Sequence, residues 1–190
     1  IVKQLSEVYR KIRNTMRYIL SNTADFDYEK DAVPFNEMLE LDRWALMHLQ
    51  LLKKEVTEAY DNYEFHVLYH AIHNFCTVEM SSYYLDILKD RLYAYKADSK
   101  ERRSAQTAMY EILMDLMVML TPVLSFTMEE VWQFMKKPAN APVSVQMLPW
   151  PQVKEEYLDE ALEAKWDNFI EIRSDITKVL EVARREKTIG

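Results

Sequence analysis

Glycine is almost absent from this 190-residue chain, and the only one is Gly190, the last residue. Globular chains average about 7% glycine, so roughly a dozen would be expected. Phosphate-binding loops, dinucleotide-binding turns and nucleophile elbows need internal glycines, because their backbones adopt positive φ angles or approach a ligand closely. Tight β-hairpin turns favour glycine as well. The sequence therefore excludes these sites and predicts an all-α protein with little loop.

The composition suits a folded protein without disulfides. Hydrophobic residues make up 49% of the chain and aromatic residues 12%, which is enough for a sizeable core. The single Cys76 cannot form an internal disulfide, and no apolar stretch approaches the roughly 18 residues of a membrane span. We therefore expect a cytoplasmic protein that does not bind membranes. Because the chain starts at Ile1 rather than methionine, we also expect it to be part of a longer protein.

Apolar residues recur every three or four positions along most of the chain, which is typical of helices with one buried face. The pattern predicts a bundle of about six to seven helices, over about residues 1–20, 36–62, 64–79, 81–95, 100–120, 127–137 and 158–187. Asp98 and Ser99 fit the N-cap of the fifth helix. Thr127 and Glu130 fit a capping box at the start of the sixth.

The connections between helices suggest three parts. Prolines concentrate between Pro138 and Pro151, where one short extended connector is predicted near residues 143–148. We expect residues 1–23 to form a basic first helix, residues 24–150 the helical bundle, and residues 151–190 a C-terminal helix that Gly190 ends.

Two groups of side chains raise the question of a metal or catalytic site. His66, His70, His73 and Cys76 share one face of a predicted helix and could bind zinc. The same segment is rich in core residues, and the sequence offers no second ligand pair, so we predict no metal site. Two pairs of carboxylates, Asp86 with Asp90 and Glu129 with Glu130, could serve in acid and base catalysis. The first pair fits an exposed helix face and the second fits a first helical turn. We therefore predict no catalytic residue.

Charge is divided into segments, although the total is −7. Residues 1–23 carry +4, residues 24–42 carry −6, and residues 84–110 carry +2. A local stripe of basic residues can bind phosphates whatever the total charge. For the basic residues of the first helix, composition alone favours a place on the solvent-exposed side of an amphipathic helix. Phosphate binding is the alternative. Four aromatic residues could stack on bases, but their spacing favours the core: Tyr9, Tyr18, Trp44 and Trp132.

Several motifs then carry a resemblance to a known family. Residues 6–17 (Ser-Glu-Val-Tyr-Arg-Lys-Ile-Arg-Asn-Thr-Met-Arg) resemble the segment that follows the catalytic domain in isoleucyl-tRNA synthetases. The segments 42–44, 75–93 and 102–107 match the same family in the same order. Residues 122–132 resemble a signature shared with the valyl and leucyl enzymes, and residues 183–190 also fit. The resemblance covers nearly the whole chain.

The resemblance implies an all-helical anticodon-binding domain that holds isoleucine tRNA, tRNA(Ile), and is not itself catalytic. The intact enzyme would join isoleucine to tRNA with ATP and magnesium, and a C-terminal region beyond this chain would often carry zinc. No cofactor is expected in the 190 residues, and we expect a monomer. The two catalytic signatures of class I synthetases, His-Ile-Gly-His and Lys-Met-Ser-Lys-Ser, do not occur in the chain.

Basic residues within the matching motifs are the candidate tRNA-binding residues. They are Arg10, Lys11, Arg13, Arg17, Lys89, Arg91, Arg102 and Arg103. The first four share one helix that could follow the phosphates of an RNA stem. Some of the others could instead pair with carboxylates and fix the bundle. Two alternatives stay open: the corresponding domain of a valyl- or leucyl-tRNA synthetase, and a helical module that binds another protein.

Overall fold

The computed structural model describes residues 2–189 and is built from helices, with no strand in that range. The prediction of an all-α bundle is confirmed. Ile1 and Gly190 lie outside the described residues, and with them the prediction that Gly190 ends the last helix. The chain divides into two compact units, one up to Tyr157 and one from Leu158 on. The predicted first helix belongs to the first unit.

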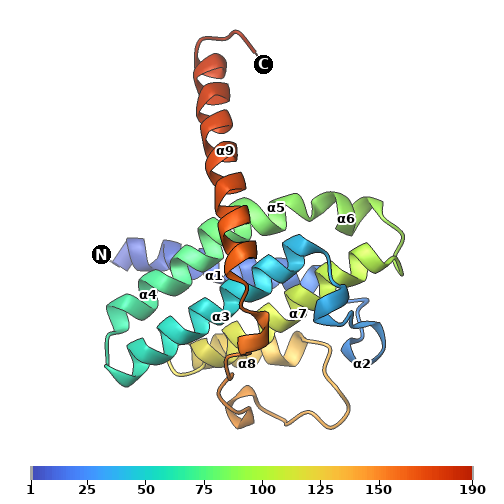
Figure 1. Ribbon diagram of the computed structural model, residues 1–190. Helices are drawn as coiled ribbons and strands as arrows, with labels where there is room; N and C mark the ends of the chain where they lie inside the picture. Colours follow the sequence, from blue (N-terminus) through green and yellow to red (C-terminus); the bar gives the residue numbers. More distant parts are fainter. Residues whose placement is uncertain (1, 190) are drawn as a thin grey trace. The chain divides into compact units, whose positions relative to one another are not determined.

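The first unit contains the elements that follow. They are α1 (Val2–Asn22), α2 (Tyr28–Asp31), the 3-10 turn η1 (Phe35–Glu37), α3 (Glu40–Asp61), α4 (Phe65–Asn74), the π-helix η2 (Phe75–Tyr84), α5 (Leu85–Ile87), α6 (Lys89–Ala94), α7 (Lys100–Leu120), α8 (Ser125–Phe134), and the 3-10 turns η3 (Val145–Met147) and η4 (Glu155–Tyr157). Long helices α3 and α7 pack on each other, and α1 packs against α7, α8, α4 and η2 (Figure 1).

The core of the first unit consists largely of the residues that the spacing of apolar residues predicts. Trp44 and Trp132 are buried, so the prediction that they are core residues is confirmed, whereas the same prediction is wrong for Tyr9, which is 38% exposed. On α1, Ile12, Met16 and Ile19 are buried as well, but Leu5 at the beginning of the same apolar stripe is 52% exposed. Helix α1 is therefore held in the core along its C-terminal half.

A single helical run replaces the two helices predicted over residues 64–79 and 81–95, so the predicted break near Met80 is wrong. Its middle, η2, is a π-helix, whose wider turns are rare in proteins. The hydroxyls of Ser81 and Ser82 each donate a 2.7 Å hydrogen bond to the carbonyl five residues earlier, on Cys76 and Thr77. The two serines thus support the wide turn that periodicity alone cannot anticipate.

The ends of two helices adopt left-handed backbone angles without glycine. Tyr63 after α3 and Lys187 after α9 (Glu160–Arg185) both have φ of 57°. In each case the following amide donates to a carbonyl five residues back: Glu64 to Ala59 at 2.7 Å, and Thr188 to Ala183 at 2.9 Å. This is the pattern that usually places glycine at the left-handed position.

Helix N-termini agree only in part with the sequence. Ser99 accepts a hydrogen bond from the amide of Arg102, which confirms it as the N-cap of α7. The capping box at Thr127 is wrong, because α8 begins two residues earlier at Ser125 and its N-cap residue, Leu124, makes no side-chain cap. The Thr127 hydroxyl instead lies 3.1 Å from the hydroxyl of Tyr9 on α1.

The connector after α8 is not extended throughout. Residues Val145–Met147 form a 3-10 turn between the extended residues Ser144 and Leu148, so the predicted extended segment is wrong at its centre. Glu129 holds the turn, because its carboxylate accepts from the Ser144 hydroxyl at 2.7 Å and from the Val145 amide at 3.2 Å. A side chain on α8 thus replaces the strand partner that an extended segment would need.

The second unit consists mainly of α9, which begins after the N-cap Asp159. The carboxylate of Asp159 accepts from the amides of Ala161 and Leu162. Apolar side chains of α9 that the periodicity predicted as a face are at least half exposed: Phe169, Ile172, Ile176 and Val179. Within residues 2–189, no helix combines the length and the apolar character that crossing a membrane requires.

Candidate nucleic-acid interface

Three arginines of α1 form one basic face. At 100° per residue, Arg10, Arg13 and Arg17 fall within about 60° of one another around the helix. Arg10 pairs with Glu7 one turn away and keeps 64% of its side chain exposed. Arg13 lies 3.7 Å from Glu130 of α8, which is a long and exposed contact. No described carboxylate lies within ion-pair distance of Arg17.

Lys11 does not belong to this face. It points about 100° away from Arg10 around the helix. The charge of Lys11 acts on His73 of α4, where burial and then this lysine lower the pKa of the imidazole. The structure therefore separates Lys11 from the three arginines with which the sequence grouped it.

Arg91 lies in a buried network instead of on a surface. Its guanidinium donates two hydrogen bonds of 2.9 Å to the carboxylate of Asp42, whose side chain is fully buried. Tyr84 and Ser104 donate to the same carboxylate at 2.8 and 2.5 Å. Burial raises the pKa of the Tyr84 hydroxyl well above its usual value. Arg91 thus joins α6 to α3 and has little surface to offer a ligand.

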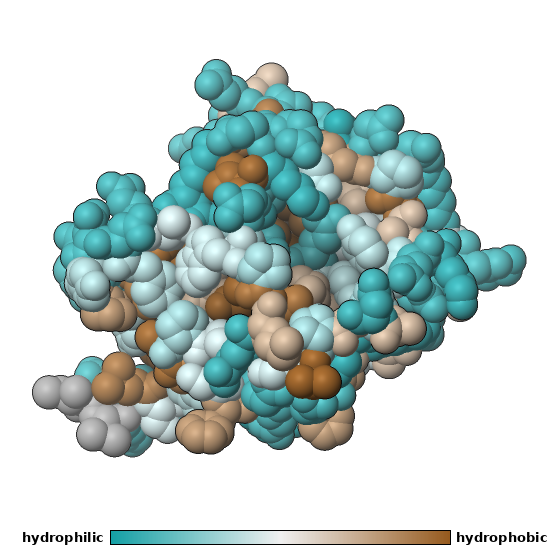
Figure 2. Space-filling view, turned by 90° about the horizontal axis from the view of Figure 1, so that it is seen from below, coloured by the Kyte–Doolittle hydropathy of each residue, from teal (hydrophilic) through white to brown (hydrophobic). Residues whose placement is uncertain are grey.

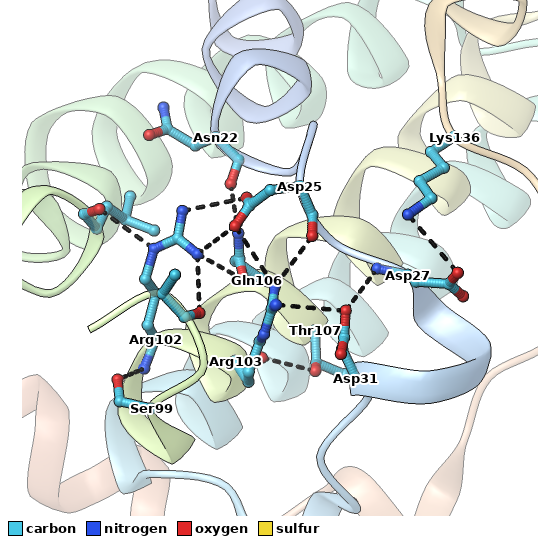
Figure 3. Close-up of polar contacts among 12 residues, drawn as sticks. Asn22, Asp25, Asp27, Asp31, Ser99, Arg102, Arg103, Gln106, Thr107 and Lys136 are labelled. Carbon is cyan, nitrogen blue, oxygen red and sulfur yellow. Dashed lines mark hydrogen bonds and ion pairs between the residues drawn. The ribbon is translucent and has the colours of Figure 1, made fainter. Parts of the chain in front are cut away.

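Arg102 and Arg103 at the start of α7 are held by the loop after α1 (Figure 3). Arg102 makes two hydrogen bonds to the carboxylate of Asp25, at 2.6 and 3.1 Å, and donates to two backbone carbonyls. Arg103 lies 3.5 Å from Asp31. The hydrogen bond from Arg102 lowers the pKa of the Asp25 carboxyl. Both guanidinium groups are therefore engaged with the protein itself.

The charge segments of the sequence pair with each other in space. Five ion pairs link the acidic segment 24–42 to the basic segment 84–110: Asp25–Arg102, Asp25–Arg103, Asp31–Arg103, Glu37–Lys100 and Asp42–Arg91. Lys89 of α6 pairs with a near neighbour in the chain, Asp86 of α5, at 2.8 Å. Among residues 2–189, no such acidic segment lies opposite the positive charge of α1, and the ion pairs of its basic residues are those of Arg10 and Arg13.

Comparison with known proteins shows the family of this chain. The family described as "Anticodon-binding domain of tRNA ligase" matches residues 42–190. The chain belongs to this family. It is 55% identical to an isoleucine–tRNA ligase of Moorella thermoacetica and 56% identical to one of Caldanaerobacter subterraneus, in each case over the whole chain. The chain spans about 20% of the length of these curated relatives.

In this anticodon-binding domain, the histidine and cysteine cluster of the sequence does not come together. His66 and His70 are exposed, and Cys76 is buried, where burial raises the pKa of its thiol to about 12. Across residues 2–189, no three side chains of histidine, cysteine, aspartate or glutamate are placed to hold a metal ion.

The domain also exposes aromatic side chains that sequence reasoning missed. Phe126 is 94% exposed and Phe134 is 76% exposed, both on α8. Seen from below, the side of the first unit that carries α8 shows hydrophobic atoms in the open among hydrophilic ones (Figure 2). Phe126 directly precedes the predicted N-cap Thr127, and Phe134 fits the spacing of the core, so neither had a signal of exposure in the sequence.

Proposed function

We propose that this domain binds the anticodon stem and loop of tRNA(Ile), as part of an isoleucine–tRNA ligase. The observation that carries the proposal is the identity of about 55% to isoleucine–tRNA ligases along the whole chain. This also favours the isoleucyl family over the valyl and leucyl families. In the full-length protein, the domain would hold the tRNA while its 3′ end receives isoleucine elsewhere.

The α1 face of Arg10, Arg13 and Arg17 is the part of the domain best suited to RNA phosphates. Guanidinium groups bind phosphates through paired hydrogen bonds, and a straight helix can present them along one side of an RNA stem. The other candidate arginines, Arg91, Arg102 and Arg103, are engaged by carboxylates of the domain. We therefore place the phosphate contacts on the arginines of α1, with Lys11 of α1 and Lys89 of α6 as further exposed basic residues.

The remaining parts of the proposal concern the full-length protein. ATP with magnesium would supply the activation of isoleucine, and zinc would lie in a region beyond this chain. The described residues do not fit either metal, because no three possible ligands meet. We propose a monomer in the cytoplasm.

The test measures binding of the full-length protein to tRNA(Ile) over a series of salt concentrations. Replacing Arg10, Arg13 and Arg17 by alanine should weaken binding and lower the salt slope by up to about one unit for each lost phosphate contact. A matched control removes three exposed lysines of other elements: Lys30, Lys54 and Lys178, each replaced by alanine. An unchanged slope in the folded arginine variant, or an equal loss in the control, would remove α1 from the interface.

A second arm tests the choice of tRNA. The anticodon stem-loop of tRNA(Ile) should compete with the full-length tRNA, and the stem-loop of valine tRNA should compete less well. Equal competition by both would contradict the assignment to isoleucine, even if RNA binding itself is intact.

A further inference from the structure

A groove between α1 and α8 combines basic and aromatic side chains. It encloses about 320 Å³ and is lined by Arg13, Arg17, Leu20 and Ser21 of α1 and by Thr127, Glu130, Val131 and Phe134 of α8. Ligand pockets begin at about 300 Å³, so the groove suits one group of the size of a nucleotide. It lies entirely within the first unit.

The aromatic side of the groove is an exposed helix face. Phe126 and Phe134 are eight positions apart and therefore about 80° apart around α8, with Glu130 between them. Burying a phenylalanine usually stabilises a protein by about 1.5–3 kcal/mol. Neither side chain makes this contribution to the domain, since both are largely exposed. They are free to contact another molecule.

The charge of the groove indicates which molecule. Arg17 has no ion pair with a described residue, and Arg13 has one long contact to Glu130. Proteins that bind single-stranded nucleic acids combine such positive charges, which follow the phosphates, with aromatic rings on which bases stack. An apolar protein segment would use the phenylalanines but would leave the arginines without a counter-charge. The groove therefore favours an unpaired nucleotide.

We propose that the α1–α8 groove is a subsite for an unpaired RNA nucleotide, whose base stacks on Phe134 and whose phosphate pairs with Arg13 and Arg17. Phe126 extends the stacking surface along α8 for a neighbouring base. Glu130 limits the affinity, because its carboxylate repels the phosphate and competes for Arg13. This inference rests on the proposed function, since the RNA would be the tRNA that the domain holds.

The test measures the Kd of the full-length protein for tRNA(Ile) with variants of Phe134. Phe134→Ala should weaken binding about 5- to 150-fold, the range for one stacked base, with the salt slope unchanged because no phosphate contact is lost. Phe134→Leu should lose nearly as much, because leucine keeps the apolar surface but has no aromatic face. Phe134→Trp should bind as well as the original protein. Glu130→Gln should bind more tightly, since a negative charge beside the phosphate is removed.

Tyr63→Leu, which changes an exposed aromatic residue that follows α3 and does not line the groove, is the matched control and should bind normally. Thermal melting should be unaffected in all of these variants, because the side chains are exposed. Full affinity of Phe134→Ala would overturn the proposal. So would full affinity of Phe134→Leu, which would indicate an apolar protein contact instead. Neither result would contradict the proposed function. That proposal fails only if the α1 arginines do not contribute to tRNA binding or if the tRNA(Ile) stem-loop does not compete for it.

Discussion

Two sets of arginines in this domain have the same residue type and opposite situations. Those at the start of α7 and on α6 meet the carboxylates of residues 24–42, over distances of 2.6 to 3.7 Å. Those of α1 meet two glutamates that are about half exposed, and Arg17 forms an ion pair with no carboxylate of residues 2–189. An arginine that the protein neutralises stabilises the fold, and one that it leaves open is available to an anion. The difference depends on segments far away in the chain.

The largest effect on stability is expected at Arg91. Arg91→Ala leaves the buried carboxylate of Asp42 without its counter-charge, which should lower the free energy of unfolding by about 3–5 kcal/mol. Urea unfolding of the 190-residue chain measures it. Lys89→Ala, two residues away and exposed, should leave the midpoint unchanged. An Arg91 variant as stable as the original would show that the buried network does not hold α6 to α3.

Arg102 should have an intermediate effect. Arg102→Ala removes the pair with Asp25 and two hydrogen bonds to backbone carbonyls, so we expect a loss of about 2 kcal/mol in the free energy of unfolding. The same urea experiment measures it, and the Kd for tRNA of the folded protein should not change. A variant that keeps its stability and loses RNA affinity would show that Arg102 binds RNA as the α1 arginines do. It would contradict the distinction between the two sets of arginines.

The pair between Asp25 and Arg102 should also give a pH dependence. The pKa of Asp25 in the folded protein lies below its ordinary value of 3.8. The ionised carboxylate therefore adds stability above pH 4, and this is lost as the pH falls through the lowered pKa. Asp25→Asn should be less stable than the original protein at pH 7, by about 1 kcal/mol or less because the side chain is partly exposed.

The measurement is the difference in unfolding free energy between Asp25→Asn and the original protein from pH 7 to pH 3. The difference should narrow at the acidic end. A constant difference would mean that the carboxylate acts through packing and not through its charge.

The smallest effect on stability is expected in α1. The variant with Arg10, Arg13 and Arg17 replaced by alanine should unfold within about 0.5 kcal/mol of the original protein for each substitution, as exposed substitutions usually do. Urea unfolding beside the tRNA titration separates the two roles. A loss as large as that of Arg102→Ala would show that α1 also uses its arginines to hold the fold.

The sequence was a good guide to the helices and a poor guide to the surface. Apolar spacing predicted the core residues Trp44 and Trp132, because a buried helical face has a period that the chain itself carries. It missed the π-helix at Ser81, since the wide turn depends on hydroxyls that reach the backbone carbonyls five residues earlier. It also placed the start of α8 at Thr127, whose hydroxyl contacts Tyr9 from another helix.

The candidate site shows the same limit. The motif residues 102 and 103 could be recognised from the sequence, but their ion pairs join positions more than 70 residues apart. Phe134 has core spacing and lies exposed, because burial depends on which neighbours cover a helix face. Local patterns can therefore predict where basic and aromatic residues occur, while the fold decides which of them another molecule can reach.

The left-handed backbone at Tyr63 has one more consequence. An L-amino acid with a side chain is less stable than glycine in this conformation, so the end of α3 contains a local cost that the rest of the fold tolerates. Natural proteins stay only moderately above the stability that function needs. Tyr63→Gly should therefore stabilise the domain and could offset a destabilising substitution elsewhere in it. The chain has no glycine before Gly190, so this means of stabilisation is unused.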